Sequence, residues 1–173
     1  MYKAILLILI GVMFAFTVVA QTPNDGRDKD REAIKTEIGR ITQAFIDRDI
    51  ETIYKTHSED WSGFLNDAQT VPIYGIDAYM KANGIPWPAP AGYKASPNPK
   101  LKYTISNYLC TFVAPEIGVA SFTLDYPQQD GVNFRRLRIM DVFAKRKGTW
   151  IQTASYTVLD PAWKAEQLAK PKQ

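Results

Sequence analysis

The chain has few of the residues that build metal centres and disulfides. Its 173 residues include one histidine, His57, and one cysteine, Cys110. A structural zinc site needs about four such ligands and a disulfide needs two thiols, so neither is expected, and no cofactor is predicted. Cys110 lies in the apolar alternation of Tyr108, Cys110 and Phe112, which predicts a small buried side chain rather than a reactive thiol.

A strong net charge is absent as well. The formal net charge is +3, and the two basic runs, Arg135-Arg136-Leu137-Arg138 and Lys145-Arg146-Lys147, are short. The first run alternates across a strand and the second falls at a hairpin turn, so solvated faces explain both. Nucleic-acid binding depends on clustered cations and is therefore not predicted.

Long hydrophobic runs are missing except at the N-terminus. An apolar run from Ala4 to Phe16 follows Lys3, and Val18-Val19-Ala20 suits a signal-peptidase cleavage site. The run is shorter than the about 20 residues that cross a bilayer. We therefore predict a signal peptide over residues 1–20 and an exported protein, periplasmic or secreted, without membrane attachment after cleavage. An uncleaved membrane anchor is the alternative.

Apolar residues at helical spacing follow a short polar leader, which is predicted to be disordered over residues 21–29. One stripe recurs at steps of three and four and consists of Ile34, Ile38, Ile41 and Phe45. It predicts a helix that begins near Asp28 or Asp30, because either carboxylate can accept hydrogen bonds from the first turn. A second short helix is predicted after Asp49, with an apolar face formed by Ile50, Ile53, Tyr54 and His57.

The pattern then changes to strands and turns. Short strands are predicted at residues 61–65 and 70–74, and a short helix over 76–82 ends at Asn83-Gly84. Residues 84–99 are rich in proline, which lacks an N–H donor and fixes φ. This stretch predicts a stiff, extended loop whose large side chains are Trp87 and Tyr93.

Period-two alternation in the rest of the chain predicts long antiparallel strands. They are expected over 101–113, 117–126 and, as a closing hairpin turned at Lys147-Gly148, over 132–160. Helices first and strands afterwards indicate one α+β domain over residues 30–161, with a short tail over 162–173.

This layout resembles the nuclear transport factor 2-like superfamily and, within it, the SnoaL-like and ketosteroid isomerase-like proteins. The segments that carry the resemblance are HSEDW, YGIDAYMKANG and RLRIMDVFAKRKGTWIQTASYTVLD, within residues 30–160. The resemblance implies a cone-shaped, strongly curved and mostly antiparallel sheet wrapped around N-terminal helices. It implies no single activity, since the superfamily includes isomerases, cyclases, dehydratases and non-catalytic binding or dimerisation domains.

Asp141 is the candidate site residue with the clearest pattern. Its face of the strand also carries Leu137, Ile139 and Phe143, so a carboxylate stands among residues that are expected to be buried. The resemblance places Asp141 at the position of a protonated aspartate that helps a tyrosine to hold an oxyanion in ketosteroid isomerases. The general base and the tyrosine of those enzymes fall near Leu65 and Ile41, which cannot take these roles.

Three functions remain open. The first is an exported binding domain for a small apolar or amphipathic molecule. Its pocket would be lined by Tyr54, Trp61, Tyr79, Leu137, Ile139, Asp141, Phe143 and Ser155, and covered by Trp87 and Tyr93 of the proline-rich loop. The pattern leaves open whether Ser155 or Tyr156 faces the interior.

The second function is an isomerase, cyclase or lyase without a metal, which would use Asp141 and His57 as acid and base. Binding is favoured over catalysis, because an enzyme needs a base and a stabilising group at the same ligand atom, and His57 also suits a buried structural histidine. The third function is a homodimeric interaction module. Its interface would be the outer face of the strands, where Phe134, Met140 and Val142 alternate with Arg136 and Arg138.

Overall fold

The structure, a computed structural model, describes residues 25–66 and 69–169. The first half of this chain holds α1 (Asp28–Asp47), α2 (Ile50–Thr56), β1 (His57–Phe64), β2 (Ile73–Tyr74) and α3 (Ile76–Ala82). The second half holds β3 (Thr104–Ala114), β4 (Ile117–Pro127), β5 (Phe134–Arg146), β6 (Thr149–Leu159) and α4 (Pro161–Ala169). The predicted signal peptide lies outside the described residues. Within the described ranges, no helix is both long enough and apolar enough to cross a membrane.

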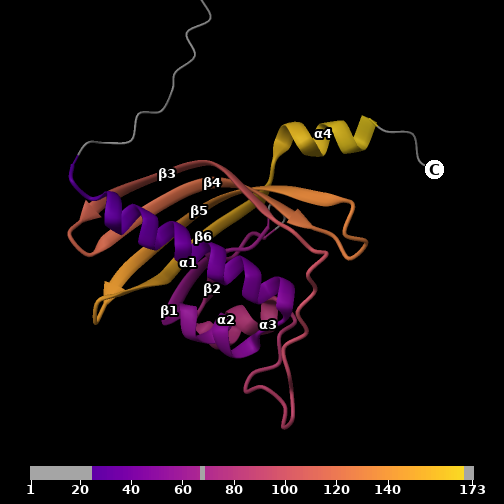
Figure 1. Cartoon of the computed structure of the whole chain (residues 1–173), viewed down its shortest axis with the longest axis horizontal. Coiled ribbons are helices and arrows are strands. Elements are labelled where there is room, and N and C mark those ends of the chain that lie inside the picture. The colour runs from indigo at the N-terminus through magenta and orange to yellow at the C-terminus, as the bar shows by residue number, and fades with distance from the viewer. Residues whose placement is uncertain (1–24, 67–68, 170–173) are drawn as a thin grey trace, which may run out of the picture.

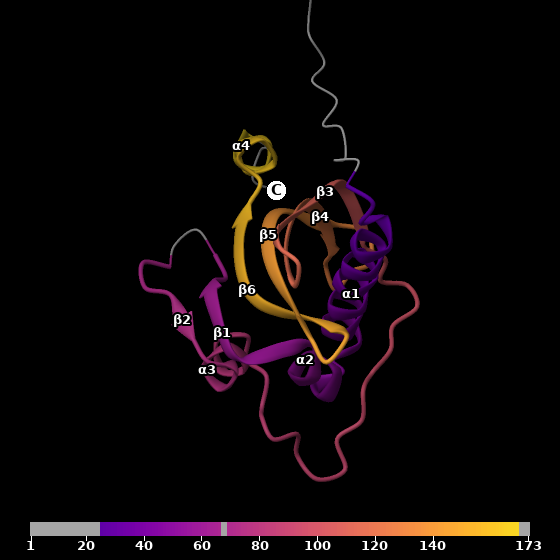
Figure 2. The same cartoon turned by 90° about the vertical axis from the view of Figure 1, so that its left-hand side faces the viewer.

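The strands form one curved sheet in the order β2-β1-β6-β5-β4-β3. Neighbouring strands are antiparallel except β1 and β6, which are parallel. The sheet bends around α1, which lies across its concave face, while β1, β2, α2 and α3 close one end (Figures 1 and 2). The predicted α+β class, a cone-shaped and mostly antiparallel sheet wrapped around N-terminal helices, is confirmed.

The stripe on α1 packs into the concave face as the spacing predicts. The first core cluster contains Ile34, Ile38, Ile41, Cys110, Ala120, Phe122, Leu124, Phe143 and Trp150. Gly118 of β4 lets the helix approach, because a Cβ at this position would lie 2.6 Å from Cδ1 of Ile34. The prediction that Cys110 is a buried hydrophobic side chain is confirmed, since its side chain is free and fully buried.

A second core cluster fills the end of the cone below α1. It contains Ala44, Ile50, Ile53, Trp61, Ile76, Tyr79 and Met80. Phe45, at the C-terminal end of α1, packs against both clusters. This position of Phe45 matters for the site, because the cavity described below lies between the two clusters.

The helices start where the sequence predicts, but the N-cap agrees for α2 and differs for α1. Asp49 is the N-cap of α2, and its carboxylate accepts from the Thr52 backbone N–H, as predicted. The expected cap of α1 by Asp28 or Asp30 is wrong: Arg27 is the N-cap residue, and no side chain caps the helix. Asp30 instead accepts hydrogen bonds from Arg27, Lys145 and Trp150, so tertiary contacts take up its carboxylate.

His57 is not on a helix, which corrects the expectation for α2. Its backbone is extended, with φ −112° and ψ 150°, and it opens β1 opposite Gln152 of β6. The pairing with β6 therefore extends β1 four residues before the predicted start at 61. Its antiparallel partner β2 covers only Ile73–Tyr74, less than the predicted 70–74.

The other boundaries are close to the expected ones. α3 spans the predicted residues 76–82, and the proline-rich stretch forms a loop with a cis peptide bond between Trp87 and Pro88. β3 begins at Thr104 rather than 101, and β5 begins at Phe134 rather than 132. The predicted disorder of the leader over residues 21–29 is wrong for its described part. Asp25 forms an ion pair of 2.7 Å with the buried Arg31, and Asp28 and Lys29 belong to α1.

Candidate functional site

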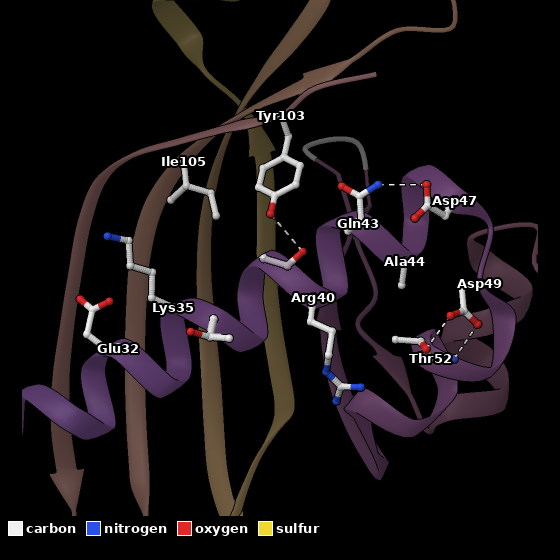
Figure 3. Close-up of a pocket in the computed structure, with 12 residues that line it drawn as sticks. Glu32, Lys35, Arg40, Gln43, Ala44, Asp47, Asp49, Thr52, Tyr103 and Ile105 are labelled. Carbon is white, nitrogen blue, oxygen red and sulfur yellow. Dashed lines mark hydrogen bonds between the residues drawn. The ribbon is translucent and has the colours of Figure 1, made fainter. Parts of the chain in front are cut away.

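A large open groove runs along α1, shown in Figure 3. Several of its polar side chains bond to one another or to nearby backbone. Gln43 donates to Asp47, Thr52 donates to Asp49, and the Tyr103 hydroxyl donates to the Gly39 carbonyl. The polar side chains of Glu32, Lys35 and Thr36 are exposed to solvent. The described groove residues therefore offer no unpaired buried polar group that would orient a ligand, and we do not regard the groove as the site.

A smaller cavity of about 270 Å³ lies inside the cone, between α1, α3 and the concave face of the sheet. Its apolar lining comprises Ile38, Ile41, Phe45, Leu65, Phe122, Leu124, Leu137 and Ile139. Its polar lining comprises Thr42, Tyr79, Asn83, Tyr126, Arg135, Asp141, Gln152, Ser155 and Thr157. A concave apolar pocket with a few convergent polar groups is the usual form of a small-molecule site.

Asp141 is a buried and strongly perturbed polar group in this cavity. Its side chain is 3% exposed, and its Oδ1 atom has no hydrogen-bond partner. Burial raises the pKa of the Asp141 carboxyl to about 7, and interactions with Ser155 and Gln152 lower it in part. The carboxyl therefore carries its proton below neutral pH, where it can donate as well as accept a hydrogen bond.

Tyr79 brings a second neutral hydroxyl to the same place from α3. Burial raises the pKa of the Tyr79 phenol well above its usual range, and the nearby Asp141 carboxyl raises it further. The tyrosine therefore stays protonated. Asp141 and Tyr79 together present two hydrogen-bond donors to one end of the cavity.

His57 lies behind Tyr79 and does not line the cavity. Its Nδ1 is 2.6 Å from the Ile53 carbonyl oxygen, which can only accept, so the proton is on Nδ1 and the imidazole Nε2 is an acceptor without a partner. The ring packs on Tyr79 with centroids 4.6 Å apart. Burial lowers the pKa of His57 to about 4, so it is neutral at physiological pH. The predicted pair of Asp141 and His57 does not meet at one ligand position.

Gln152 connects the two buried titratable groups. Its side-chain oxygen accepts from the Trp61 indole N–H at 3.0 Å, and its amide contributes to the pKa of both Asp141 and His57. Between Gln152 and Ser155 the register of β5 and β6 shifts at a bulge. The shift puts Ser155 opposite Asp141 inside the cavity, while Tyr156 is 47% exposed on the outer face.

Five of the eight predicted pocket residues line the cavity, namely Tyr79, Leu137, Ile139, Asp141 and Ser155. The other three do not line it. Trp61 and Phe143 are fully buried in the two core clusters, because their large side chains fill the space between sheet and helices. Tyr54 stacks on Trp87 at a centroid distance of 3.9 Å.

Neither predicted lid residue covers Asp141. Trp87 is occupied by its stack with Tyr54, and Tyr93 donates its hydroxyl hydrogen bond to the Arg48 carbonyl. In both cartoons the tip of the proline-rich loop extends away from the sheet (Figures 1 and 2). Tyr93 instead helps to line a second hollow, beside the cavity at the end of α1.

Sequence reasoning missed Asn83, Tyr126, Arg135, Gln152 and Thr157 as cavity residues. Arg135 had a usable signal, since it lies at period-two spacing from Leu137, Ile139 and Asp141. Gln152 had no such signal in the sequence, because its orientation depends on the bulge in β6. Leu65 and Ile41, where the resemblance places a general base and a tyrosine, do line the cavity, so those positions of the fold carry apolar side chains here.

No metal site is apparent in the described part of the chain, where no three histidine, cysteine, aspartate or glutamate side chains gather closely enough to hold an ion. The polar groups of the cavity are hydroxyls, amides, one carboxyl and one guanidinium. This set suits hydrogen bonding to an organic ligand.

Comparisons with known proteins identify the fold. No family model matches the chain, and no curated protein matches it in sequence. Solved structures do. A putative ketosteroid isomerase from Parabacteroides distasonis aligns with a TM-score of 0.58 and 14% identity, covering 82% of this chain and 96% of that chain.

Two further structures have the same architecture. A nuclear transport factor 2-like protein of unknown function from Pseudomonas putida aligns with a TM-score of 0.56 and 17% identity, over 75% of this chain and 86% of that chain. The association domain of CaMKII from C. elegans aligns with a TM-score of 0.54 and 17% identity, over 75% and 98%. At such identities a structural match shows the fold and not the activity. The chain therefore has the nuclear transport factor 2-like fold, the α+β architecture that these structures share.

Proposed function

We propose that this chain is a binding domain for a small, largely apolar molecule, which occupies the cavity between α1, α3 and the sheet. The observation that carries the proposal is Oδ1 of Asp141, a buried polar atom without a partner, in a cavity that eight apolar side chains also line. A buried unpaired polar atom costs about 1 to 3 kcal/mol, so a ligand oxygen or nitrogen that bonds to it recovers free energy on binding. The signal peptide predicted over residues 1–20 supports the further proposal that this binding domain is exported.

Catalysis is the alternative, and one observation favours it. Asp141 and Tyr79 are neutral donors that face the same cavity, an arrangement that can stabilise developing charge on an oxygen. An isomerase, cyclase or lyase also needs a base at the reacting atom. Among the described residues that line the cavity, Asp141 is the one carboxyl and none is a histidine, so a second acid–base group is missing and binding is the better supported function.

A homodimer is the proposed assembly. Met140 and Tyr156 lie directly opposite each other in the register of β5 and β6, and each is 47% exposed on the face of the sheet that α1 does not cover. The likeness to a CaMKII association domain also supports an interaction role for this fold. Arg136 and Arg138 are not expected to pair across the interface, because they bind Asp125 and Asp160 of the same chain.

The binding proposal is tested by filling the cavity. The probe is phenylnaphthylamine, a neutral dye that fluoresces in apolar surroundings. Ile139→Trp places a large ring inside the cavity, and Met140→Trp makes the same change one residue away on the outer face. We expect Ile139→Trp to weaken dye binding about tenfold or more and Met140→Trp to leave it unchanged. Equal binding by the wild type and Ile139→Trp would contradict the proposal.

Asp141→Asn separates binding, catalysis and a purely structural role. The substitution keeps the shape of the side chain but removes proton exchange. A binding domain retains the dye with altered affinity for ligands that bond to residue 141, whereas an enzyme loses its turnover. A structural role predicts a loss of stability of about 1 to 3 kcal/mol with unchanged dye affinity. Denaturation and dye titration of the same variant separate the structural role from binding, and loss of a measured turnover would identify an enzyme.

A further inference from the structure

The inference concerns the chemical class of the ligand and rests on the proposed binding function. One wall of the cavity is the inner face of β5, which carries Arg135, Leu137, Ile139 and Asp141 at every second position. Arg135 and Asp141 are six residues apart and so lie at most about 20 Å apart along an extended strand. In the register with β4, Arg135 pairs with Tyr126. The cavity therefore has a deep end at Asp141 and another end at Arg135 and Tyr126.

A second hollow of about 440 Å³ adjoins this outer end. Phe45, Asn83 and Tyr126 line both hollows, so the two meet at these side chains. Arg48 lines the second hollow, just after the last residue of α1. Tyr126 is therefore flanked by a guanidinium on each side, Arg135 in the first hollow and Arg48 in the second. We call this group of Arg48, Tyr126 and Arg135 the mouth.

Arg48 and Arg135 differ from the other arginines in the described part of the chain. Each of the others forms an ion pair with a carboxylate, whereas these two have no carboxylate partner. The paired arginines are Arg27, Arg31, Arg40, Arg136, Arg138 and Arg146. Asp47 and Asp49 adjoin Arg48 in sequence, but they line the groove on the other side of α1, where Gln43 and Thr52 donate to them. The mouth is therefore a pair of exposed positive charges without a carboxylate partner beside the cavity.

The position of Tyr126 agrees with this charge. Burial raises the pKa of its phenol, while the nearby Arg135 and Arg48 lower it, so both cations act on the same hydroxyl. The C-terminal end of α1 opposes this positive charge, because the helix dipole places about half a negative charge there. The Asp47 and Arg48 carbonyls there already accept from the Ser96 N–H and the Tyr93 hydroxyl, and two full positive charges outweigh the remainder.

We propose that the ligand is an amphipathic organic anion, whose acidic group is bound at the mouth by Arg48, Arg135 and the Tyr126 hydroxyl. Its apolar body lies along Leu124, Leu137 and Ile139, toward Asp141. A carboxylate or sulfonate matches the fork of a guanidinium through charge-assisted hydrogen bonds. A neutral apolar ligand would leave both guanidiniums without a counter-charge.

The test uses two dyes that differ by one acidic group. Anilinonaphthalene sulfonate carries a sulfonate, and phenylnaphthylamine has the same ring system without it. The variant is the double substitution Arg48→Asn and Arg135→Gln. Asparagine suits position 48, where φ is 55°. The matched control is the double substitution Lys29→Gln and Lys147→Asn, which removes two exposed positive charges far from the mouth. Lys147, like Arg48, has a positive φ, so the backbone at this position is matched as well.

We expect the wild type to bind the sulfonated dye more tightly than the neutral dye, with an affinity that falls as salt rises. The Arg48→Asn and Arg135→Gln variant should bind the sulfonated dye about tenfold or more weakly and the neutral dye as before, while the lysine control binds both like the wild type. If the arginine variant binds both dyes like the wild type, the anion inference is wrong and the binding proposal stands. If neither dye is sensitive to Ile139→Trp, the binding proposal itself is wrong.

Discussion

At the scale of single residues, the site contains two buried groups whose titrations oppose each other. The pKa of Asp141 is raised to about 7 from an ordinary value of 3.8, and the pKa of His57 is lowered to about 4 from 6.5, both chiefly by burial. Between those values the folded state holds a proton on Asp141 that the unfolded state releases. It also lacks a proton on His57 that the unfolded state binds.

The first prediction follows from these signs. Asp141 makes the free energy of unfolding fall as pH rises from about 4 to about 7, whereas His57 makes it rise from about 4 to about 6.5. Each contributes up to about 1.4 kcal/mol per pH unit, so the wild-type profile should be nearly flat in the shared window. Asp141→Asn removes only the falling contribution. Its stability, measured by chemical denaturation, should therefore rise with pH toward about 6.5, and pH profiles that run parallel to the wild type would contradict the assignment.

The same residues show what a sequence can predict about a site. The inward orientation of Asp141 follows from period two, since Leu137 and Ile139 on the same face must be buried. The sequence could not show which of Ser155 and Tyr156 faces the cavity. A bulge between Gln152 and Ser155 reverses the alternation of β6, and this bulge depends on the pairing of β6 with β5. Arg135 was interpreted as part of a solvated basic run, and it is exposed, but its parity relative to Asp141 also puts it on the inner face of β5, where it lines the cavity.

At the scale of elements, helices and hairpins were predictable where their signals are local. The α3 helix and the turn at Lys147-Gly148 depend on short-range propensity and were found where expected. The start of β1 was missed by four residues. Its parallel partner β6 is about ninety residues away in sequence, and the helical spacing of Ile50, Ile53 and His57 continues by coincidence into its first residue. Gly63 of β1 marks this pairing, since a Cβ there would overlap the Ser155 backbone.

The proline-rich loop gives the second prediction. It is attached to the body by the stack of Trp87 on Tyr54 rather than placed over Asp141. Trp87→Ala should therefore lower the free energy of unfolding by about 1 to 2 kcal/mol while leaving phenylnaphthylamine affinity unchanged. Trp87→Phe, which keeps an aromatic face, is the control and should lose less. A large loss of dye affinity in Trp87→Ala at unchanged stability would instead support a lid.

At the scale of the whole molecule, α1 covers only one side of the sheet (Figure 2). The uncovered side carries Met140 and Tyr156 at its centre, with the Phe64 ring edge-on to Tyr156 at 6.1 Å. Val119, Val142 and Val158 are half-buried beside them. The ion pairs of Arg136 with Asp125 and Arg138 with Asp160 satisfy the charges at one border of this surface within the chain. An apolar centre bordered by paired charges is typical of an interface between protein surfaces.

The last prediction is that two copies associate through this face. A stable interface buries about 800 Å² on each partner, and a lysine at its centre would have to lose its hydration without a counter-charge. Met140→Lys should therefore shift the protein from dimer to monomer in sedimentation analysis. Val132→Lys, at a residue that is 84% exposed in the turn before β5, should leave the dimer intact. Because Met140 points away from the cavity, the monomeric variant should still bind the neutral dye, and a wild type that sediments as a monomer at every concentration would contradict the dimer.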